Sequence, residues 1–346
     1  MLRILTAGES HGRGLVAILE GLPAGLKVDV DFINAQLKRR QMGFGRGKRM
    51  QIEKDKTEII SGLKAGMTLG SPVAILIKNR DFSIEKLHKV VAPRPGHADL
   101  AGLLKYGFSD VRDVLERASA RSTAATVGCG AIAKIFLRQL RINVTSAVIS
   151  IGGEVSHEAK MRKIQEAIDR KDTVGGVFEV RAFGAPVGLG SYVQPDRRLD
   201  SRLSGALMSI PGIKGVEIGL GFGYAQRFGS EVHDQIYYEK GKGIVRPTNN
   251  AGGIEGGISN GQDIIVRCCM KPISTLLEPL HSIHISTRKP AKAAVERSDI
   301  CAVESAGVVA EAVVAQVLAD ACLEKFGSDS MSDIKAGYKH YLKRIF

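Results

Sequence analysis

Tryptophan is absent from this chain, and aromatic residues make up only 5% of its 346 residues. Proteins that bind nucleic acid usually offer aromatic platforms for base stacking or contain a recognisable binding module, and neither is found here. No apolar run of about 18 residues is found either, which argues against a transmembrane helix. The apolar run at the N-terminus is too short for a signal peptide. We therefore expect a cytoplasmic protein that acts on neither nucleic acid nor membrane.

Cysteines are few, and their arrangement excludes two classes of structure. The five are odd in number, lack the spacing of metal sites, and four of them lie in apolar surroundings; they are Cys129, Cys268, Cys269, Cys301 and Cys322. Secreted disulfide scaffolds need paired cysteines. Reduced core thiols and no metal centre are the expectation, again typical of the cytoplasm.

Positive charge is in excess, with 49 Lys and Arg against 36 Asp and Glu, a net +13. Such a balance favours anionic partners: nucleic acid, a membrane surface or phosphorylated metabolites. The hydrophobic fraction of 44% permits a large core. Length alone suggests about two domains. However, no linker, low-complexity tract or long-period repeat divides the chain, which favours one intertwined domain over residues 1–346.

Residues 91–123 are rich in arginine, and part of their backbone is restricted by proline. Two prolines and Gly96 form a turn that fixes Arg94 and His97 relative to each other. Arg117 and Arg121 are four residues apart, so on a helix they share one face and repel each other unless an anion lies between them. The pattern indicates either a solvated basic face or a bound anion.

Five other loops have a composition suited to anions. Residues 8–14 expose His11 between glycines, and residues 38–49 carry six cations and three glycines, as either a disordered basic loop or a mobile flap over a polyanion. Residues 249–261 contain five glycines and form either a wide turn or backbone that lies against a ligand. Residues 271–275 could cradle phosphate, and residues 297–299 are polar. These loops span the chain, so either several weak sites exist or one fold gathers them.

Hydrophobic periodicity predicts alternating strands and helices. Strands are expected at residues 2–7, 15–19, 51–60, 71–78, 141–151, 177–183, 214–219 and 263–270. Helices are expected from an N-cap at Asp31 to residue 40, and at residues 123–140, 156–170, 200–210 and 306–326. A last amphipathic helix is expected within residues 328–346. Long apolar helices and many strands indicate a mixed α and β protein.

Nine segments, taken in order, resemble the chorismate synthase family from end to end. They are GESHG (8–12), RRQMGFGRGKRMQIEKD (39–55), RPGHAD (94–99), KYG (105–107), RDVLERASAR (112–121), MSIPGIKGVEIGLGF (208–222), NNAGGIEGGISNG (249–261), KPIST (271–275) and RSDICAV (297–303). The resemblance implies an α+β fold: a β-α-β sandwich in which long central helices lie between two mostly antiparallel sheets.

The resemblance also implies an activity. The family converts 5-enolpyruvylshikimate 3-phosphate to chorismate and phosphate, a trans-1,4 elimination in the shikimate pathway to the aromatic amino acids. It requires reduced FMN without net redox change. The substrate carries two carboxylates and a phosphate, which fits the clustered arginines. A homotetramer is implied, with NADPH or an external flavin reductase as alternative sources of electrons.

Family roles carry over to matching positions. The catalytic residues implied are His11, His97 and Asp299. The implied flavin contacts are Arg117, Ala118, Ser119, Pro211, Gly212, Gly256, Lys271, Pro272, Ile273, Ser274, Thr275 and Arg297. The implied substrate contacts are Arg40, Arg46, Arg49, Arg94, Arg121 and Arg297, and Arg40 and Arg46 are also the implied NADP contacts.

Some positions depart from the family pattern: Ala118 stands where many members have Ser, Ser122 where many have Glu, and Glu304-Ser305 where others have Pro followed by Arg or Ala. Two other functions stay open at this point. A basic protein that binds nucleic acid or polyphosphate would account for the net charge and for residues 38–49. An inactive binding scaffold of the same family is opposed by the presence of both histidines and Asp299.

Overall fold

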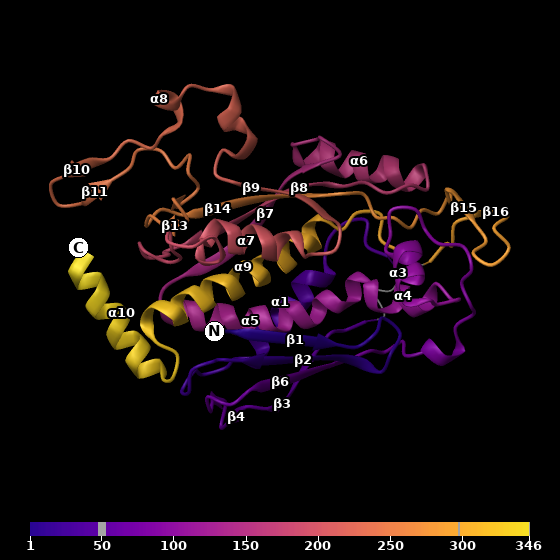
Figure 1. Cartoon of the computed structure of the whole chain (residues 1–346), viewed down its shortest axis with the longest axis horizontal. Coiled ribbons are helices and arrows are strands. Elements are labelled where there is room, and N and C mark those ends of the chain that lie inside the picture. The colour runs from indigo at the N-terminus through magenta and orange to yellow at the C-terminus, as the bar shows by residue number, and fades with distance from the viewer. Residues whose placement is uncertain (48–52, 297, 346) are drawn as a thin grey trace.

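Two antiparallel four-stranded sheets enclose a layer of helices in the computed structural model, which describes residues 1–47, 53–296 and 298–345 (Figure 1). The first sheet has the order β1-β2-β6-β3, formed by Arg3–Ala7, Gly14–Glu20, Val73–Lys78 and Thr57–Ser61. The second has the order β7-β8-β14-β9, formed by Asn143–Ile151, Gly176–Phe183, Ile264–Met270 and Ile213–Ile218.

Alternation along the strands decides which face of the first sheet meets the helices. In β2, Leu15 and Leu19 are buried, whereas Val16 and Ile18 point to the outer face. The register pairs Leu15 with Ile77 of β6, which is also buried. Successive strand residues point to opposite faces, so these side chains form one continuous inner layer.

The helices between the sheets come from distant parts of the chain. Helix α5 (Thr123–Gln139) lies against β2 and β6, α9 (Val303–Phe326) lies against β7 and β8, and the two helices pack on each other. Helices α1 (Val30–Gln41) and α7 (Leu199–Met208) complete the layer. The expected β-α-β sandwich is confirmed.

Gly130 explains how closely α5 and α9 approach. A Cβ atom built on Gly130 would lie 2.2 Å from the Cβ of Ala312 in α9. No larger residue fits at this crossing without moving one helix, because interiors are close-packed.

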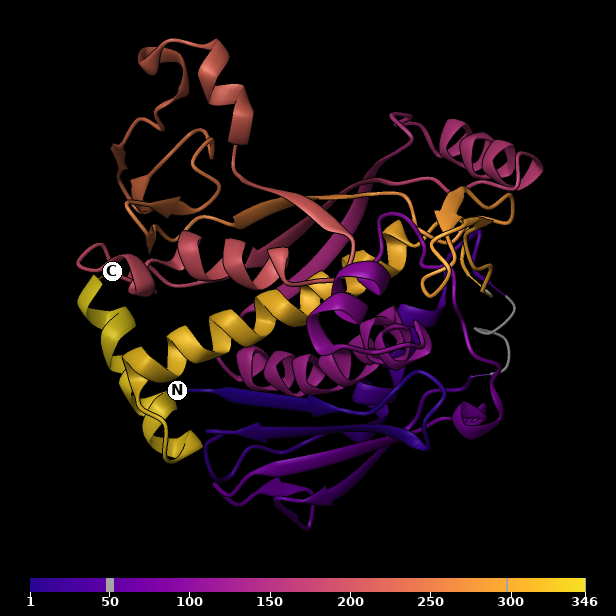
Figure 2. The ribbon, with the colours of Figure 1, turned by 45° about the vertical axis from the view of Figure 1, so that its right-hand side comes forward.

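The expectation that the chain has no long apolar run is wrong for helix α9. Its 24 residues are long and apolar enough to cross a membrane by length and composition, although no such run was expected. In the fold, 83% of its most apolar window is buried, and the helix runs through the middle of the molecule (Figure 2). Its apolar character belongs to the core.

Several element boundaries differ from expectation. The N-cap of α1 is Asp29, whose side chain accepts from the Phe32 N–H, and not Asp31, which lies in the first turn. Helix α9 begins at Val303 instead of residue 306. The strand expected at residues 51–60 is β3 from Thr57, and its first two expected residues lie outside the described residues.

The remaining elements surround the sandwich. The peripheral helices are α3 (Asp99–Tyr106), α4 (Arg112–Ala118), α6 (His157–Asp169), α8 (Gly229–Val232) and α10 (Met331–Ile345). The short strands form the hairpins β4–β5 (Leu63–Lys64, Met67–Thr68), β10–β11 (Tyr237–Glu239, Gly243–Val245), β12–β13 (Ile254–Glu255, Ile258–Ser259) and β15–β16 (His281–Ile283, Pro290–Lys292). In both views the arm with α8, β10 and β11 projects from the end of the molecule opposite to α3 and α4 (Figures 1 and 2).

All five cysteines are free thiols, as expected. Cys269 is exposed, whereas the other four are buried. Burial raises the pKa of Cys129 and of Cys322 to about 12. A thiol that stays protonated is a poor nucleophile, so these residues pack as small hydrophobic groups.

Candidate active site

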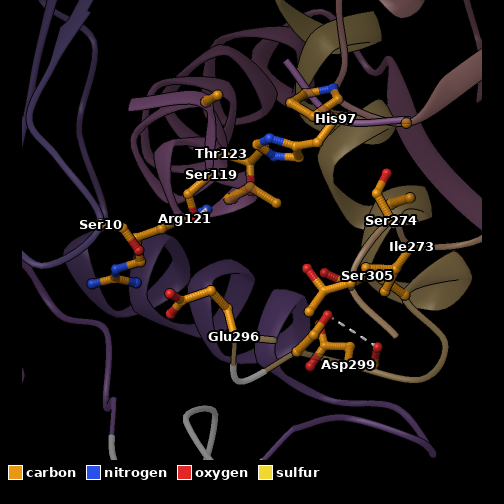
Figure 3. A pocket seen from close by; sticks show the side chains of 18 of the residues that line it. Ser10, His97, Ser119, Arg121, Thr123, Ile273, Ser274, Glu296, Asp299 and Ser305 are labelled. Atoms are coloured by element: carbon orange, nitrogen blue, oxygen red, sulfur yellow. Dashed lines mark hydrogen bonds between the residues drawn. The ribbon is translucent and has the colours of Figure 1, made fainter. Parts of the chain in front are cut away.

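A cavity of about 420 Å³ lies beside α4, at the end of the molecule where α3 and the β15–β16 hairpin meet the start of α9. It gathers most of the residues expected at a site. Those that line it are His11, Arg40, Arg46, Arg94, His97, Ala118, Ser119, Arg121, Pro211, Gly212, Lys271, Pro272, Ile273, Ser274, Thr275 and Asp299. Figure 3 shows His97, Ser119 and Arg121 on one side of the cavity, with Glu296 and Asp299 on the other.

His97 is held by a buried carboxylate. Its Nδ1 atom donates to Asp99, and Asp99 also accepts from Arg94 Nε at 2.8 Å and from the Arg94 backbone N–H at 3.0 Å. Burial alone would raise the pKa of Asp99, but the hydrogen bonds from His97 and Arg94 outweigh it and hold the pKa well below its usual range. The turn therefore presents His97 with Nδ1 fixed and Nε2 as the remaining ring nitrogen.

The loop of residues 271–275 is tied to this turn. Arg94 Nη1 donates to the Thr275 hydroxyl at 2.7 Å, and the Ser274 hydroxyl donates to the Gly96 carbonyl at 2.9 Å. Lys271 also donates to the Gly96 carbonyl, and partial burial together with nearby Lys214 lowers its pKa. Two segments 170 or more residues apart in sequence thus form one wall of the cavity, with hydroxyl and ammonium donors along it.

Two buried arginines share a carboxylate. Arg40 Nη2 lies 2.8 Å from Asp55 Oδ2, and Arg121 Nη1 lies 2.6 Å from Asp55 Oδ1. Arg121 Nε also donates to Asn79 at 2.9 Å. Burial lowers the pKa of Arg40, and Asp55 opposes that shift. A second buried carboxylate, Glu53, lies 3.9 Å from Arg121 Nη2, so two acids face the two guanidinium groups in this corner.

Three guanidinium nitrogen atoms of cavity-lining arginines make no hydrogen bond within the described part of the chain. Among the described residues, no hydrogen bond reaches the buried Arg40 Nε, Arg46 Nε or Arg121 Nη2 atom. Buried N–H groups without acceptors are costly and rare in folded proteins. An anion bound in the cavity would supply such acceptors.

Asp299 is bonded to two residues of the basic loop, residues 38–49. Its Oδ2 atom lies 2.8 Å from Arg46 Nη1, and its Oδ1 atom accepts from the Gly47 backbone N–H at 2.6 Å. Arg46 and Gly47 of this loop therefore line the cavity, whereas Met42, Gly43 and Phe44 line an adjoining one. Of the two departures at residues 304–305, Ser305 lines this cavity, whereas Glu304 lines an adjoining one beside Gly43.

His11 is paired with a carboxylate that the sequence did not single out. Both oxygens of Glu116 lie 3.0 Å from His11 Nδ1, and one of them accepts from the His11 backbone N–H at 2.8 Å. Glu116 is 4% exposed. Burial alone would raise its pKa, but the bonds from His11 outweigh it and lower the pKa. Like His97, His11 thus has one ring nitrogen committed to a buried acid.

Of the four expected residues that remain, the two that the structure describes, Arg117 and Gly256, do not line this cavity. Arg117 and Arg121 do not share a helix face, because α4 ends at Ala118 and Ser119 adopts an extended backbone (φ −63°, ψ 141°) before a short 3₁₀ turn. Arg117 instead donates to the carbonyls of Gly8 and Thr6 from the outside.

Gly256 lies between β12 and β13, at the opposite end of the molecule from α3 and α4 (Figure 1). It does not line the cavity of its own chain. The other two residues, Arg49 and Arg297, lie outside the described residues.

Apart from Asp299, the acids in and beside the cavity were not predicted from the sequence. Asp55, Asp99 and Glu116 each bond to an arginine or a histidine that lines the cavity, whereas Glu296 bonds to Arg112 of α4. A signal was available for Asp99, because it lies two residues after His97 on the same stiff turn. The pairing of Asp55 with Arg121 and of Glu116 with His11 joins residues 66 and 105 positions apart, which no local pattern reveals. Across the described ranges no group of His, Cys, Asp or Glu side chains could hold a metal ion.

Comparison with known proteins identifies the family of this chain. A family model described as "Chorismate synthase" matches residues 2–323. Curated proteins named chorismate synthase are similar over nearly their whole length. The protein of Thermoanaerobacter pseudethanolicus is 54% identical, with 99% of this chain and 98% of that protein aligned. The protein of Geobacter sulfurreducens is 50% identical, with 100% and 99% aligned.

A solved structure described as "Crystal Structure of Chorismate Synthase" superimposes with a TM-score of 0.81 at 42% identity. The superposition covers 99% of this chain and 98% of that one. The chain belongs to the chorismate synthase family, enzymes of the shikimate pathway that form chorismate.

Proposed function

We propose that this cavity binds 5-enolpyruvylshikimate 3-phosphate beside reduced FMN and eliminates phosphate from it to give chorismate. The observation that carries the proposal is the set of buried guanidinium N–H groups without acceptors, on Arg40, Arg46 and Arg121. A ligand with two carboxylates and a phosphate supplies such acceptors. Each charge-assisted hydrogen bond contributes about 1.5–3 kcal/mol, so a few suffice for micromolar binding after ordering costs.

The residues present also fit a flavin. Apolar side chains for one face of a planar ring come from Leu115, Ile210, Met270 and Val309, which line the same cavity. The hydroxyl and ammonium groups of residues 271–275 suit a phosphate tail. When bound, reduced FMN would lend electron density to the substrate as phosphate leaves and regain it as hydrogen is lost. We assign flavin contacts to Ser119, Pro211, Gly212 and residues 271–275, whereas a contact with Gly256 would have to come from another copy of the chain.

Each acid or base of the site then has a role in proton transfer. His97, with Nδ1 bonded to Asp99, gives a proton to the departing phosphate from Nε2. His11 holds a proton for the reduced cofactor. Asp299, bonded to Arg46 and the Gly47 N–H, would help to take a proton from the flavin. Arg94 and Arg121 orient the anionic groups of the substrate.

We further propose a cytoplasmic homotetramer. The outer face of the sheet β1-β2-β6-β3 supports self-association, because it exposes apolar side chains from three strands: Leu5, Val16, Ile18 and Ile60 are 39–58% exposed. Isolated exposed apolar residues are normal, but a continuous patch marks an interaction surface. Electrons would come either from NADPH held by Arg40 and Arg46 or from an external flavin reductase.

The test is a reaction without oxygen. Purified protein, dithionite-reduced FMN and 5-enolpyruvylshikimate 3-phosphate should yield chorismate and one equivalent of phosphate, while the flavin ends as reduced as it began. Omission of FMN should abolish the product. Absence of chorismate from correctly folded protein under these conditions would refute the proposal.

A further inference from the structure

We propose that Glu116 is the positioning residue for His11: it fixes the tautomer of the imidazole so that protons enter and leave at Nε2. The proposal rests on the proton-handling role proposed for His11 and adds to it the group that sets the direction of transfer.

The carboxylate of Glu116 grips two atoms of the same residue. It accepts from the His11 backbone N–H at 2.8 Å, and both of its oxygens lie 3.0 Å from Nδ1. The Glu116 carbonyl accepts from the neighbouring Ser10 N–H at 2.9 Å. Thus one residue of α4 anchors the loop that carries His11 and also orients its ring.

Glu116 is itself held in place. Arg112, one turn earlier in α4, lies 3.4 Å from Glu116 Oε1 and reaches Glu296 on the cavity wall at 3.0 Å. With 4% of Glu116 exposed, water cannot take over these bonds. Its lowered pKa accords with a carboxylate that stays ionised.

An ionised carboxylate only accepts hydrogen bonds, so the Nδ1 atom that faces it must carry the hydrogen. In the neutral ring Nε2 then has the lone pair and is the atom that exchanges protons. Asp81 Oδ2 lies 4.0 Å from Nε2, so a second acid stands beside the exchanging atom. The opposite tautomer would place the lone pair on Nδ1, against the carboxylate of Glu116.

Replacing Glu116 by Gln tests this directly. The amide oxygen can still accept from the His11 backbone N–H, but the amide NH₂ then faces Nδ1 and donates, which favours hydrogen on Nε2. We expect kcat for chorismate formation to fall at least about tenfold, as for a misdirected acid or base. We expect KM for the phosphate substrate to change less than about threefold, since Glu116 does not line the cavity.

A nitrogen-15 NMR spectrum of histidine-labelled protein reports the tautomer independently of activity. The His11 signal, identified by its loss in His11→Asn, should show hydrogen on Nδ1 in the wild type and on Nε2 in Glu116→Gln. Glu116→Asp, which keeps an acceptor, should retain the wild-type tautomer and recover activity relative to Gln. Glu158→Gln is the matched control, because Glu158 is an exposed helical glutamate at 87%.

The outcomes separate this inference from the proposed function. Wild-type kcat in Glu116→Gln, or hydrogen on Nε2 in the wild type, would overturn it even though chorismate is formed. Equal losses in Glu116→Asp and Glu116→Gln with an unchanged tautomer would also overturn it, because a structural role alone gives that pattern. Failure of the wild type to form chorismate would refute the proposed function. The NMR spectra would still show whether Glu116 sets the tautomer of His11.

Discussion

Replacement of Asp99 by Asn should damage both stability and catalysis, because this one acid serves two cations. Its side chain is fully buried and accepts from His97 Nδ1, Arg94 Nε and Arg94 Nη2. Asn keeps the shape but removes the negative charge and places an amide N–H where an acceptor is needed. The Arg94 charge is then left buried, with the Thr275 hydroxyl and the ring of His97 among its remaining contacts.

The size of the effect follows from the burial. Removing one partner of a buried ion pair costs about 3–5 kcal/mol. Unfolding entropy of about 2.1 cal/mol/K per residue amounts to roughly 0.7 kcal/mol/K over 346 residues. A loss of about 4 kcal/mol therefore lowers the unfolding midpoint by about 5 °C. The tautomer of His97 is no longer fixed, so kcat should fall by about 10²–10⁴.

Thermal unfolding at several pH values checks this. The pKa of Asp99 is depressed in the folded protein, so its contribution is fully present above its unfolded pKa of about 4 and is lost as the pH falls through the lower folded pKa. The difference between wild type and variant should be largest near pH 7 and shrink in acid. Asp169→Asn, at an exposed aspartate with a single bond from Gln165, is the control. A difference below about 1 °C at pH 7 would refute the reasoning.

The remaining predictions concern the proton donor His97, the anion-binding Arg121 and the contact between α5 and α9. His97→Ala should lower kcat by about 10²–10⁴ in the anaerobic assay, and a change under about threefold would remove His97 from proton transfer. Arg121→Lys keeps the charge but loses the planar fork, so calorimetric titration should show substrate affinity reduced at least about tenfold; unchanged affinity would contradict the assignment. Gly130→Ala should destabilise the fold by about 1–3 kcal/mol in thermal unfolding, because its Cβ meets that of Ala312. Gly205→Ala in α7, with nothing within 4 Å, should instead stabilise by about 0.5–1 kcal/mol, and equal effects of the two changes would be inconsistent with the close crossing.

Local features of this protein could be predicted from its sequence. The Ser156 cap of α6 forms as expected, and α5 begins at Thr123 and ends one residue before the expected limit. Short-range rules of capping and periodicity decide such features. The stiff turn that holds Arg94 beside His97 also has a local cause, because prolines and Gly96 fix its backbone, with φ +75° at Gly96.

Features set by tertiary contacts could not be predicted. A periodic pattern placed Arg117 and Arg121 on one helix face, but the extended backbone of Ser119 separates them. The sharing of Asp55 by Arg40 and Arg121 requires α1, the 3₁₀ turn before α5 and the segment before β3 to meet. The layer arrangement and the gathering of the loops came from the family resemblance, since hydrophobic patterning does not specify which strands pair.

The most direct test of the central claim is a crystal structure of the protein with FMN and 5-enolpyruvylshikimate 3-phosphate. We predict both ligands in the cavity between α4, residues 271–275 and the start of α9, with the substrate phosphate within hydrogen-bond distance of His97 and carboxylates or phosphate accepting from Arg40, Arg46 and Arg121. Density for either ligand outside this cavity, or a phosphate remote from His97, would contradict the account.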